Sequence, residues 1–438
     1  MDLPLHCDFD VTRIGKAVMH SRPVLLLLLM ALATGCSTPR RANLTLARLE
    51  EERPAYRAQI QRENADSILK LIRRLKREHD DFVSGKSTSP PICDVLILSG
   101  GADYGAFGAG VLQGWGQVQE GELVRPSFDV VSGVSTGALI APFALIGDDS
   151  SYERAFRLYQ EPRKDWVRTR GLLFFLPRNE SLMDVSELTR DIKREVDTDV
   201  VRQIAEASRQ GRVLNISATN LDYGQRRVWD LGREAELALQ YGGGDIDPVH
   251  RILLASSAIP GAFPPVEING LLYVDGATTA NILYENNMRS PDAPIAIWKR
   301  ECPGLPVPTM RYWVIVNNQL ESPPAVTVPN WVGVVEQSLA TSVRASTATS
   351  VEHLATQLAL LNAEGDVKAE FRVIAIPNEW RPPKPGVFVK ETMVSLATLG
   401  LQLGRDPASW KERSLLSEPY DDVSGAGDSR SCASGSRQ

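Results

Sequence analysis

The sequence feature that most constrains the fold is the pentapeptide Gly133–Gly137, GVSTG, with its flanking segments. The apolar segment FDVVS precedes it and the helix-like segment ALIAPFALIG follows it. A G-x-S-x-G motif between a strand and a helix forms a sharp turn, because glycines leave room around the serine. The turn exposes the Ser135 hydroxyl and directs the N-terminus of the next helix toward it, which favours developing negative charge. We therefore predict that Ser135 is a nucleophile; a purely structural turn is the alternative.

Short apolar runs alternate with helical patterns through most of the chain. Runs suited to buried strands lie at 95–98, 128–131, 213–216, 271–274, 313–316 and 371–376. Helical patterns lie between them, for example over 187–207 and 333–362. This alternation predicts an α/β fold with a mostly parallel sheet.

A glycine-rich loop, SGGADYGAF (99–107), directly follows the first of these strands. Backbone N–H groups in such a loop can hold an anion. A nucleotide-binding interpretation is weaker, because the loop lacks the GK[ST] ending of a P-loop and the glycine spacing of a dinucleotide fold. We expect an oxyanion hole for acyl transfer, with Gly100, Gly101 and Ala102 as donors. A tight structural turn is the alternative.

A serine nucleophile needs a base within hydrogen-bond reach. A hydrolase triad in the order Ser, Asp, His would leave His353 as the candidate. However, His353 lies in SVEHLATQLALL, which has a helical period, so we interpret it as an ordinary helix residue. Asp275 follows a predicted strand in YVDGA and can face a cleft, although an Asp-Gly turn would also fit. The sequence therefore favours a Ser135–Asp275 dyad.

Three blocks, in this order, resemble the patatin-like phospholipase family: the loop at 99–112, GVSTG with its flanks, and ASSAIPGAFPPVEINGLLYVDGATTAN at 255–281. The resemblance implies a three-layer α/β/α fold with a mostly parallel central sheet. It also implies hydrolysis of acyl esters of membrane lipids without a cofactor or metal. Ser135 matches the family nucleophile, Asp275 the base, and the 100–102 stretch the oxyanion loop.

The oxyanion loop departs from the family pattern at two positions. Ala102 stands where the family usually has a third glycine, and Tyr104 stands where it has Arg or Lys. An alanine still offers its backbone N–H, but loss of the cation is expected to alter how the loop is anchored or which head group is preferred. Two other functions stay open: a catalytically idle envelope lipoprotein that uses the fold as a binding scaffold, and a lipid acyltransferase.

The N-terminal segment has the pattern of an export signal. The apolar run Val24–Ala33 follows His20 and Arg22 and holds ten residues, whereas a membrane span needs about 20. Small residues and then Cys36 follow, which resembles the lipobox of bacterial lipoproteins. The resemblance implies a signal peptide at 1–35, a lipidated Cys36, and anchoring in the bacterial cell envelope at the outer membrane. A simple cleaved signal is the alternative.

The rest of the chain divides into three predicted regions. Residues 36–90 are predicted to hold the lipidated cysteine, a linker and a helical arm in which Pro54 ends or kinks a first helix. We interpret the arm as a solvated spacer; a partner-binding helix is the alternative. A patatin-like catalytic domain at 91–410 and a disordered tail at 411–438 follow.

Composition excludes some partners. The formal net charge of −6 gives no basic surface for a nucleic acid. The cysteines form no CxxC pair, so a metal site is not expected, and the sequence leaves open whether Cys93 and Cys302 form a disulfide. The oligomeric state also stays open. The apolar run 172–176 is interpreted as a core strand, with an exposed lipid-entry lip as the alternative.

Overall fold

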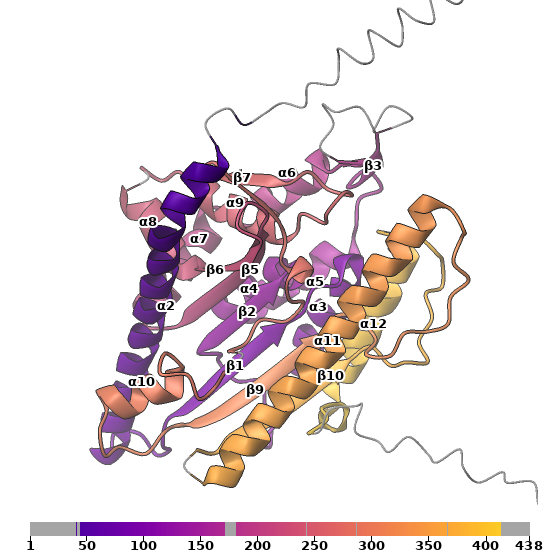
Figure 1. Ribbon diagram of the computed structural model, residues 1–438. Helices are drawn as coiled ribbons and strands as arrows, with labels where there is room; N and C mark the ends of the chain where they lie inside the picture. The colour runs from indigo at the N-terminus through magenta and orange to yellow at the C-terminus, as the bar shows by residue number, and fades with distance from the viewer. Residues whose placement is uncertain are drawn as a thin grey trace, which may run out of the picture.

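The computed structural model describes residue 41 and residues 44–170, 181–241, 243–285, 287–365 and 367–412. Within these ranges the chain forms three layers, with a central sheet between two layers of helices (Figure 1). The predicted leader, Cys36, the run 172–176 and the tail beyond 412 lie outside the described residues.

The central sheet has eight strands in the order β10-β9-β1-β2-β5-β8-β7, with β6 paired to β5. All pairs from β10 to β5 in this order are parallel, and β6, β7 and β8 pair antiparallel. The strands are β1 (Ile92–Leu98), β2 (Val130–Val134), β5 (Val213–Asn220), β6 (Gln225–Asp230), β7 (Val266–Ile268), β8 (Leu271–Asp275), β9 (Thr309–Val316) and β10 (Ala369–Ala375). The predicted α/β/α fold with a mostly parallel sheet is confirmed, and each of the six predicted strand runs overlaps one of these strands.

Helices cover both faces of the sheet. One face packs against α3 (Gly105–Trp115), α4 (Thr136–Ile146), α5 (Asp149–Gln160), α6 (Ser186–Glu195), α7 (Thr198–Arg209), α8 (Leu231–Tyr241), α9 (Asp247–Ser256) and α12 (Lys390–Arg405). The other face packs against α2 (Leu46–Val83), α10 (Pro294–Glu301) and α11 (Trp331–Glu364). A short two-stranded sheet, β3 (Arg168–Thr169) with β4 (Met183–Asp184), lies apart from the main sheet. Among the described residues, no helix is both long and apolar enough to cross a membrane.

Three tryptophans from distant parts of the chain meet in the core. Trp115 comes from α3, Trp313 from β9, and Trp410 follows α12; their ring centroids lie 4.5 to 5.4 Å apart. The backbone of Lys411 bridges Val373 of β10, so the last described segment lies against the edge strand of the sheet.

The predicted spacer arm forms one side of the domain instead of extending away from it. Helix α2 runs unbroken through Pro54, so the expectation that a first helix ends there is wrong. Leu71, Ile72 and Leu75 of α2 are buried in the same apolar cluster as the central strands. The solvated-spacer interpretation is therefore corrected: the apolar stripe of this helix is covered by its own domain, along the α2 side in Figure 1.

Polar contacts hold α2 in the same place. Glu63 forms an ion pair with Arg227 of β6, and Ser67 Oγ donates to an oxygen of Asp230 at 2.8 Å. Cys93 and Cys302 are both buried free thiols, so the open question of a disulfide is answered by two unpaired cysteines.

Candidate active site

The predicted nucleophile, Ser135, lies in the turn between β2 and α4. Its φ of 54° and ψ of −123° are strained for a residue with a side chain, as is common at functional sites. The two glycines of the motif are required by close packing. A Cβ at Gly137 would lie 2.4 Å from the Leu98 carbonyl oxygen, and one at Gly133 would lie 2.6 Å from that of Gly137.

Two further serines hold this turn from α9 and the residue after it. The Ser135 N–H donates to Ser256 Oγ at 3.0 Å, and Ser256 Oγ donates to the Ser217 carbonyl at 2.6 Å. Ser257 Oγ donates to the Ser135 carbonyl at 3.3 Å. The sequence did not single out Ser256 or Ser257, because a serine near a helix end carries no signal of a contact made 120 residues away.

Asp275 lies at the end of β8, where it pairs with Ala218 of β5. Its Oδ1 accepts the Ala277 N–H at 2.8 Å, and the Ser135 hydroxyl lies near enough to lower the pKa of the carboxyl group. Burial raises the pKa of Asp275 to about 6, against the opposing effect of these two neighbours. A carboxylate with this pKa is ionised at neutral pH, which a proton acceptor requires.

The glycine-rich loop after β1 lies against Ser135. A Cβ at Gly100 would lie 3.0 Å from that of Ser135 and 2.4 Å from Asn281 Oδ1. The Gly100 N–H donates to the Asn281 carbonyl at 3.2 Å and is therefore engaged. The N–H groups of Gly101 and Ala102 donate to no group within the described ranges. Of the three expected donors, these two are the ones available for a ligand.

Residues 96–286 match the family model described as patatin-like phospholipase. This part of the chain is therefore similar to a patatin-like phospholipase domain. This match supports a lipid hydrolase function in general.

Two solved structures are similar to this chain. VipD from Legionella pneumophila is 12% identical, with 74% of this chain and 68% of that chain covered and a TM-score of 0.32. The type III effector protein ExoU is 14% identical, with 72% of this chain and 54% of that chain covered and a TM-score of 0.29. A comparison with curated proteins found no match.

The glycine-rich loop is anchored without a cation at position 104. The Tyr104 ring stands edge-on against Trp380, with centroids 5.5 Å apart. The neighbouring Asp103 is buried and accepts the Phe388 N–H at 3.0 Å, and burial raises its pKa to about 6. The segment around 380–388 therefore holds the loop here.

Two buried asparagines complete the support of the loop. Asn317, directly after β9, accepts the Gly108 N–H and donates to the Ser99 carbonyl at 2.8 Å. Asn281 donates to Thr347 Oγ1 of α11 at 2.7 Å, and to the Gly100 carbonyl at 3.4 Å. Asn317 could have been suspected, since a polar residue that ends a buried parallel strand lies at the same edge as the other loops.

The histidines of the domain lie away from Ser135. His353 is on α11, where its Nδ1 hydrogen-bonds the Tyr284 hydroxyl at 2.8 Å. His250 is on α9, where its Nε2 hydrogen-bonds the Val196 carbonyl at 2.7 Å. Within the part of the chain that the structure describes, no cluster of His, Cys, Asp or Glu is suited to hold a metal ion.

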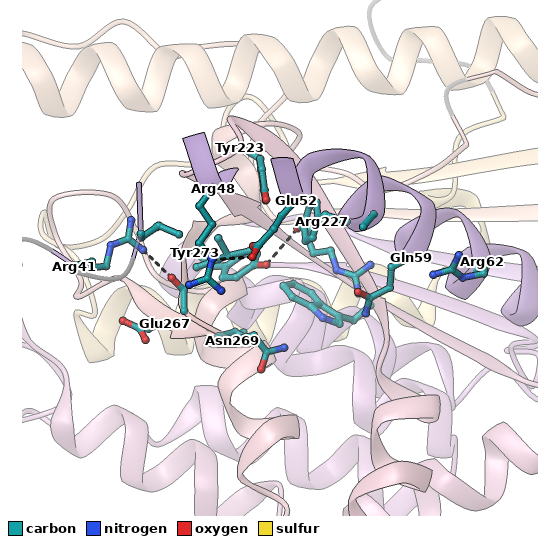
Figure 2. Close-up of a pocket in the computed structure, with 17 residues that line it drawn as sticks. Arg41, Arg48, Glu52, Gln59, Arg62, Tyr223, Arg227, Glu267, Asn269 and Tyr273 are labelled. Atoms are coloured by element: carbon teal, nitrogen blue, oxygen red, sulfur yellow. Dashed lines mark hydrogen bonds and ion pairs between the residues drawn. The ribbon is translucent and has the colours of Figure 1, made fainter. Parts of the chain in front are cut away.

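A separate hollow of about 720 Å³ lies between the N-terminal half of α2 and the β7–β8 hairpin (Figure 2). Arg48 pairs with Glu52 along α2 at its wall, Arg41 pairs with Asp222, and Tyr273 also lines it. Neither Ser135 nor Asp275 lines this hollow. It is therefore distinct from the dyad.

Proposed function

We propose that this protein is a lipid acyl hydrolase that uses a Ser135–Asp275 dyad. The observation that carries the proposal is the closeness of the Ser135 hydroxyl to the buried Asp275 carboxylate, whose pKa it lowers, next to the glycine-rich loop with the open amides of Gly101 and Ala102. This arrangement has the nucleophile, the base and the anion-binding donors that acyl transfer requires.

The reaction proceeds in two steps. In the first, Ser135 Oγ attacks the ester carbonyl carbon while Asp275 takes the hydroxyl proton. The carbonyl oxygen becomes an oxyanion, which the Gly101 and Ala102 amides and the N-terminus of α4 stabilise. The C–O bond then breaks, and the alcohol or lysolipid leaves with the proton from Asp275.

In the second step, water hydrolyses the acyl-enzyme. Asp275 takes a proton from the attacking water, the fatty acid leaves, and Ser135 regains its proton. Ser135 and Asp275 are only 4% and 3% exposed, so both steps take place where hydrogen bonds to the oxyanion are strong. Loss of one such donor typically costs about 3–4 kcal/mol in the barrier.

The decisive experiment is mass spectrometry of membrane lipids incubated with the protein and with its Ser135→Ala variant. We expect fatty acid and lysolipid from the unmodified protein alone, and a fluorophosphonate probe should label it at Ser135. Ser290→Ala, a serine outside the site, serves as the control and should retain both properties. Hydrolysis that persists in Ser135→Ala would refute the dyad, and acyl transfer to an added acceptor lipid would identify an acyltransferase instead.

We also propose that Cys36 is lipidated and anchors the protein in the bacterial envelope, at the outer membrane. The support is the sequence LLLLLMALATGC, in which an apolar core and small residues precede the cysteine. Labelling of cells with a fatty-acid analogue tests this proposal. Incorporation should occur in the unmodified protein and disappear in Cys36→Ser.

A further inference from the structure

The N-terminal end of α11 projects from the domain with apolar side chains in solvent, at the upper right of Figure 1. Trp331, Val334, Val335 and Leu339 are 67%, 50%, 58% and 37% exposed. Their spacing of three, four and eight residues places them on one face of the helix. Val326 and Val328, in the segment before the helix, are also exposed. We call these six residues the apolar tip.

The apolar tip is a built structure rather than a frayed helix end. Asn330 caps the helix, because its side-chain oxygen accepts the Gly333 N–H at 2.9 Å. A Cβ at Gly333 would lie 2.5 Å from the Val328 carbonyl oxygen, so a glycine here lets the preceding segment cross the helix. The fold therefore holds these apolar side chains in place although its own core does not cover them.

The segment that forms the apolar tip carries little charge. Between residues 322 and 343, Glu336 is the one charged residue in the sequence. Exposed apolar patches of this kind mark contacts with membranes or proteins. A patch without a charged pattern offers little to select one protein partner, whereas it suits the uncharged interior edge of a bilayer.

The helix that carries the apolar tip also supports the catalytic loop. Thr347, two turns beyond Leu339, accepts a hydrogen bond from Asn281, which in turn contacts the Gly100 carbonyl beside Ser135. Since the dyad is almost fully buried, a water-insoluble substrate has to reach it directly from a lipid phase. The tip and Thr347 lie on one continuous helix, with Leu339 and Thr347 about 12 Å apart along its axis.

We propose that the apolar tip is a docking surface for a lipid bilayer. The inference rests on the proposed function, because the bilayer is where the acyl substrate lies. The tryptophan at the start of the helix suits the boundary between head groups and acyl chains. The N-terminus of α2 lies at the same end of the molecule in Figure 1, so the chain enters the domain on the side that would face the membrane.

The first test uses two proteins that both carry Cys36→Ser. One has no further change, and the other carries Val334→Asp and Val335→Asp as well. We expect at least a tenfold lower hydrolysis rate on phosphatidylcholine vesicles and less than a twofold change on a soluble short-chain ester. Val83→Asp, an exposed valine at the far end of α2, is the matched control and should change neither rate. Equal loss on both substrates, or no loss on vesicles, would overturn the docking proposal.

The second test does not depend on catalysis. An environment-sensitive fluorophore is attached at Val335→Cys, or at the control site Lys86→Cys, in a chain whose Cys7, Cys36 and Cys432 are serines. Vesicles should shift the emission of the 335 label to the blue and leave the 86 label unchanged. An unshifted 335 label overturns the proposal. This holds even if the reason is that a second copy of the chain covers the tip. A shifted label in a chain inactive on both substrates would retain docking and refute only the hydrolase.

Discussion

Two carboxylates in this molecule, one partly buried and one fully buried, are held in opposite ways. Glu63, on α2, would have its pKa raised by burial, but hydrogen bonds from Arg227 and Gln59 and the charge of Arg233 lower it. Asp275, at the end of β8, is contacted by a hydroxyl and an amide, and burial raises its pKa to about 6. The first carboxylate is neutralised by cations, whereas the second is not.

The difference separates a carboxylate that stabilises the fold from one that can take part in proton transfer. A carboxylate paired with arginine stays ionised and fixes two elements to each other, as Glu63 fixes α2 to β6. A carboxylate that has only neutral donors keeps a proton affinity close to physiological pH, which proton transfer requires. The α2 side and the catalytic edge, the edge of the sheet that carries Ser135 and Asp275, should therefore differ in how a substitution changes activity and stability.

The largest effect is expected from Asp275→Asn. The amide keeps the shape and its oxygen can still accept the Ala277 N–H, but it cannot take a proton. We expect hydrolysis to fall by about 10³-fold, while the free energy of unfolding at pH 8 rises by about 1–2 kcal/mol, because an ionised group is no longer buried. Steady-state kinetics and urea unfolding measure the two changes. An active Asp275→Asn enzyme would end the comparison.

Gly100→Ala tests how closely the catalytic edge is packed. The added methyl group would meet Asn281 Oδ1 and the Ser135 side chain, so the loop has to move away from the nucleophile. We expect a loss of about 10²-fold in kcat, comparable to the removal of an oxyanion donor. A normal circular dichroism spectrum would show that the fold is kept, and unchanged kcat would contradict the placement of the loop.

Glu63→Gln is the structural counterpart of Asp275→Asn. It leaves the nearly buried Arg227 without its anion, which should lower the free energy of unfolding by about 2 kcal/mol. Hydrolysis should stay within twofold of the unmodified rate, since α2 does not contact the dyad. Loss of activity in a folded Glu63→Gln protein would show that the two regions are coupled.

The dependence on pH sharpens the same contrast. Because Asp275 has to be ionised to act as a base, kcat/KM should fall about tenfold between pH 7 and pH 5, with an apparent pKa near 6. Its raised pKa means that its ionisation costs stability as pH rises from about 4 to about 6. The lowered pKa of Glu63 works in reverse: its contribution is present above its unfolded value and is lost as pH falls below it. Rate and unfolding measurements across pH 4–8 check both signs.

The smallest effect is expected from Ala102→Gly, which restores the glycine usual in the family. Ala102 has a φ of 51°, where a glycine is under less strain. We expect the free energy of unfolding to change by less than about 1 kcal/mol, because relief of strain is offset by the greater freedom of glycine in the unfolded chain. Hydrolysis should be equal or slightly faster. A large loss would mean that the Ala102 methyl group itself contacts the substrate.

Much of the sheet could be predicted because its buried parallel strands are continuous apolar runs. Strand β6, QRRVWD, was missed because its arginines make it read as polar, and the anion that pairs with Arg227 comes from the distant helix α2. The predicted helix over 187–207 is two helices, α6 and α7, because Asp197 caps the second one. The strand depends on its distant partner α2, and the break between α6 and α7 depends on the local cap at Asp197.

The candidate site was predictable where its demands are local. Ser135 and the loop at 100–102 need glycines nearby for close approach, and such glycines stand out in a sequence. The roles of Asn281 and Ser256 depend on contacts with residues far along the chain, so the residue types alone gave no signal. The apolar stripe of α2 had the same limit: Ile72 and Leu75 would look alike whether covered by a partner or by this domain.

The cluster of Trp115, Trp313 and Trp410 gives the protein a built-in optical reporter. Indoles whose rings lie this close exchange excitation energy, so their combined emission depends on all three being in place. Because Trp410 precedes Lys411, which bridges to Val373, a change in that emission would follow the separation of this segment from β10. The rate of that separation could thus be measured by stopped-flow fluorescence without any added dye.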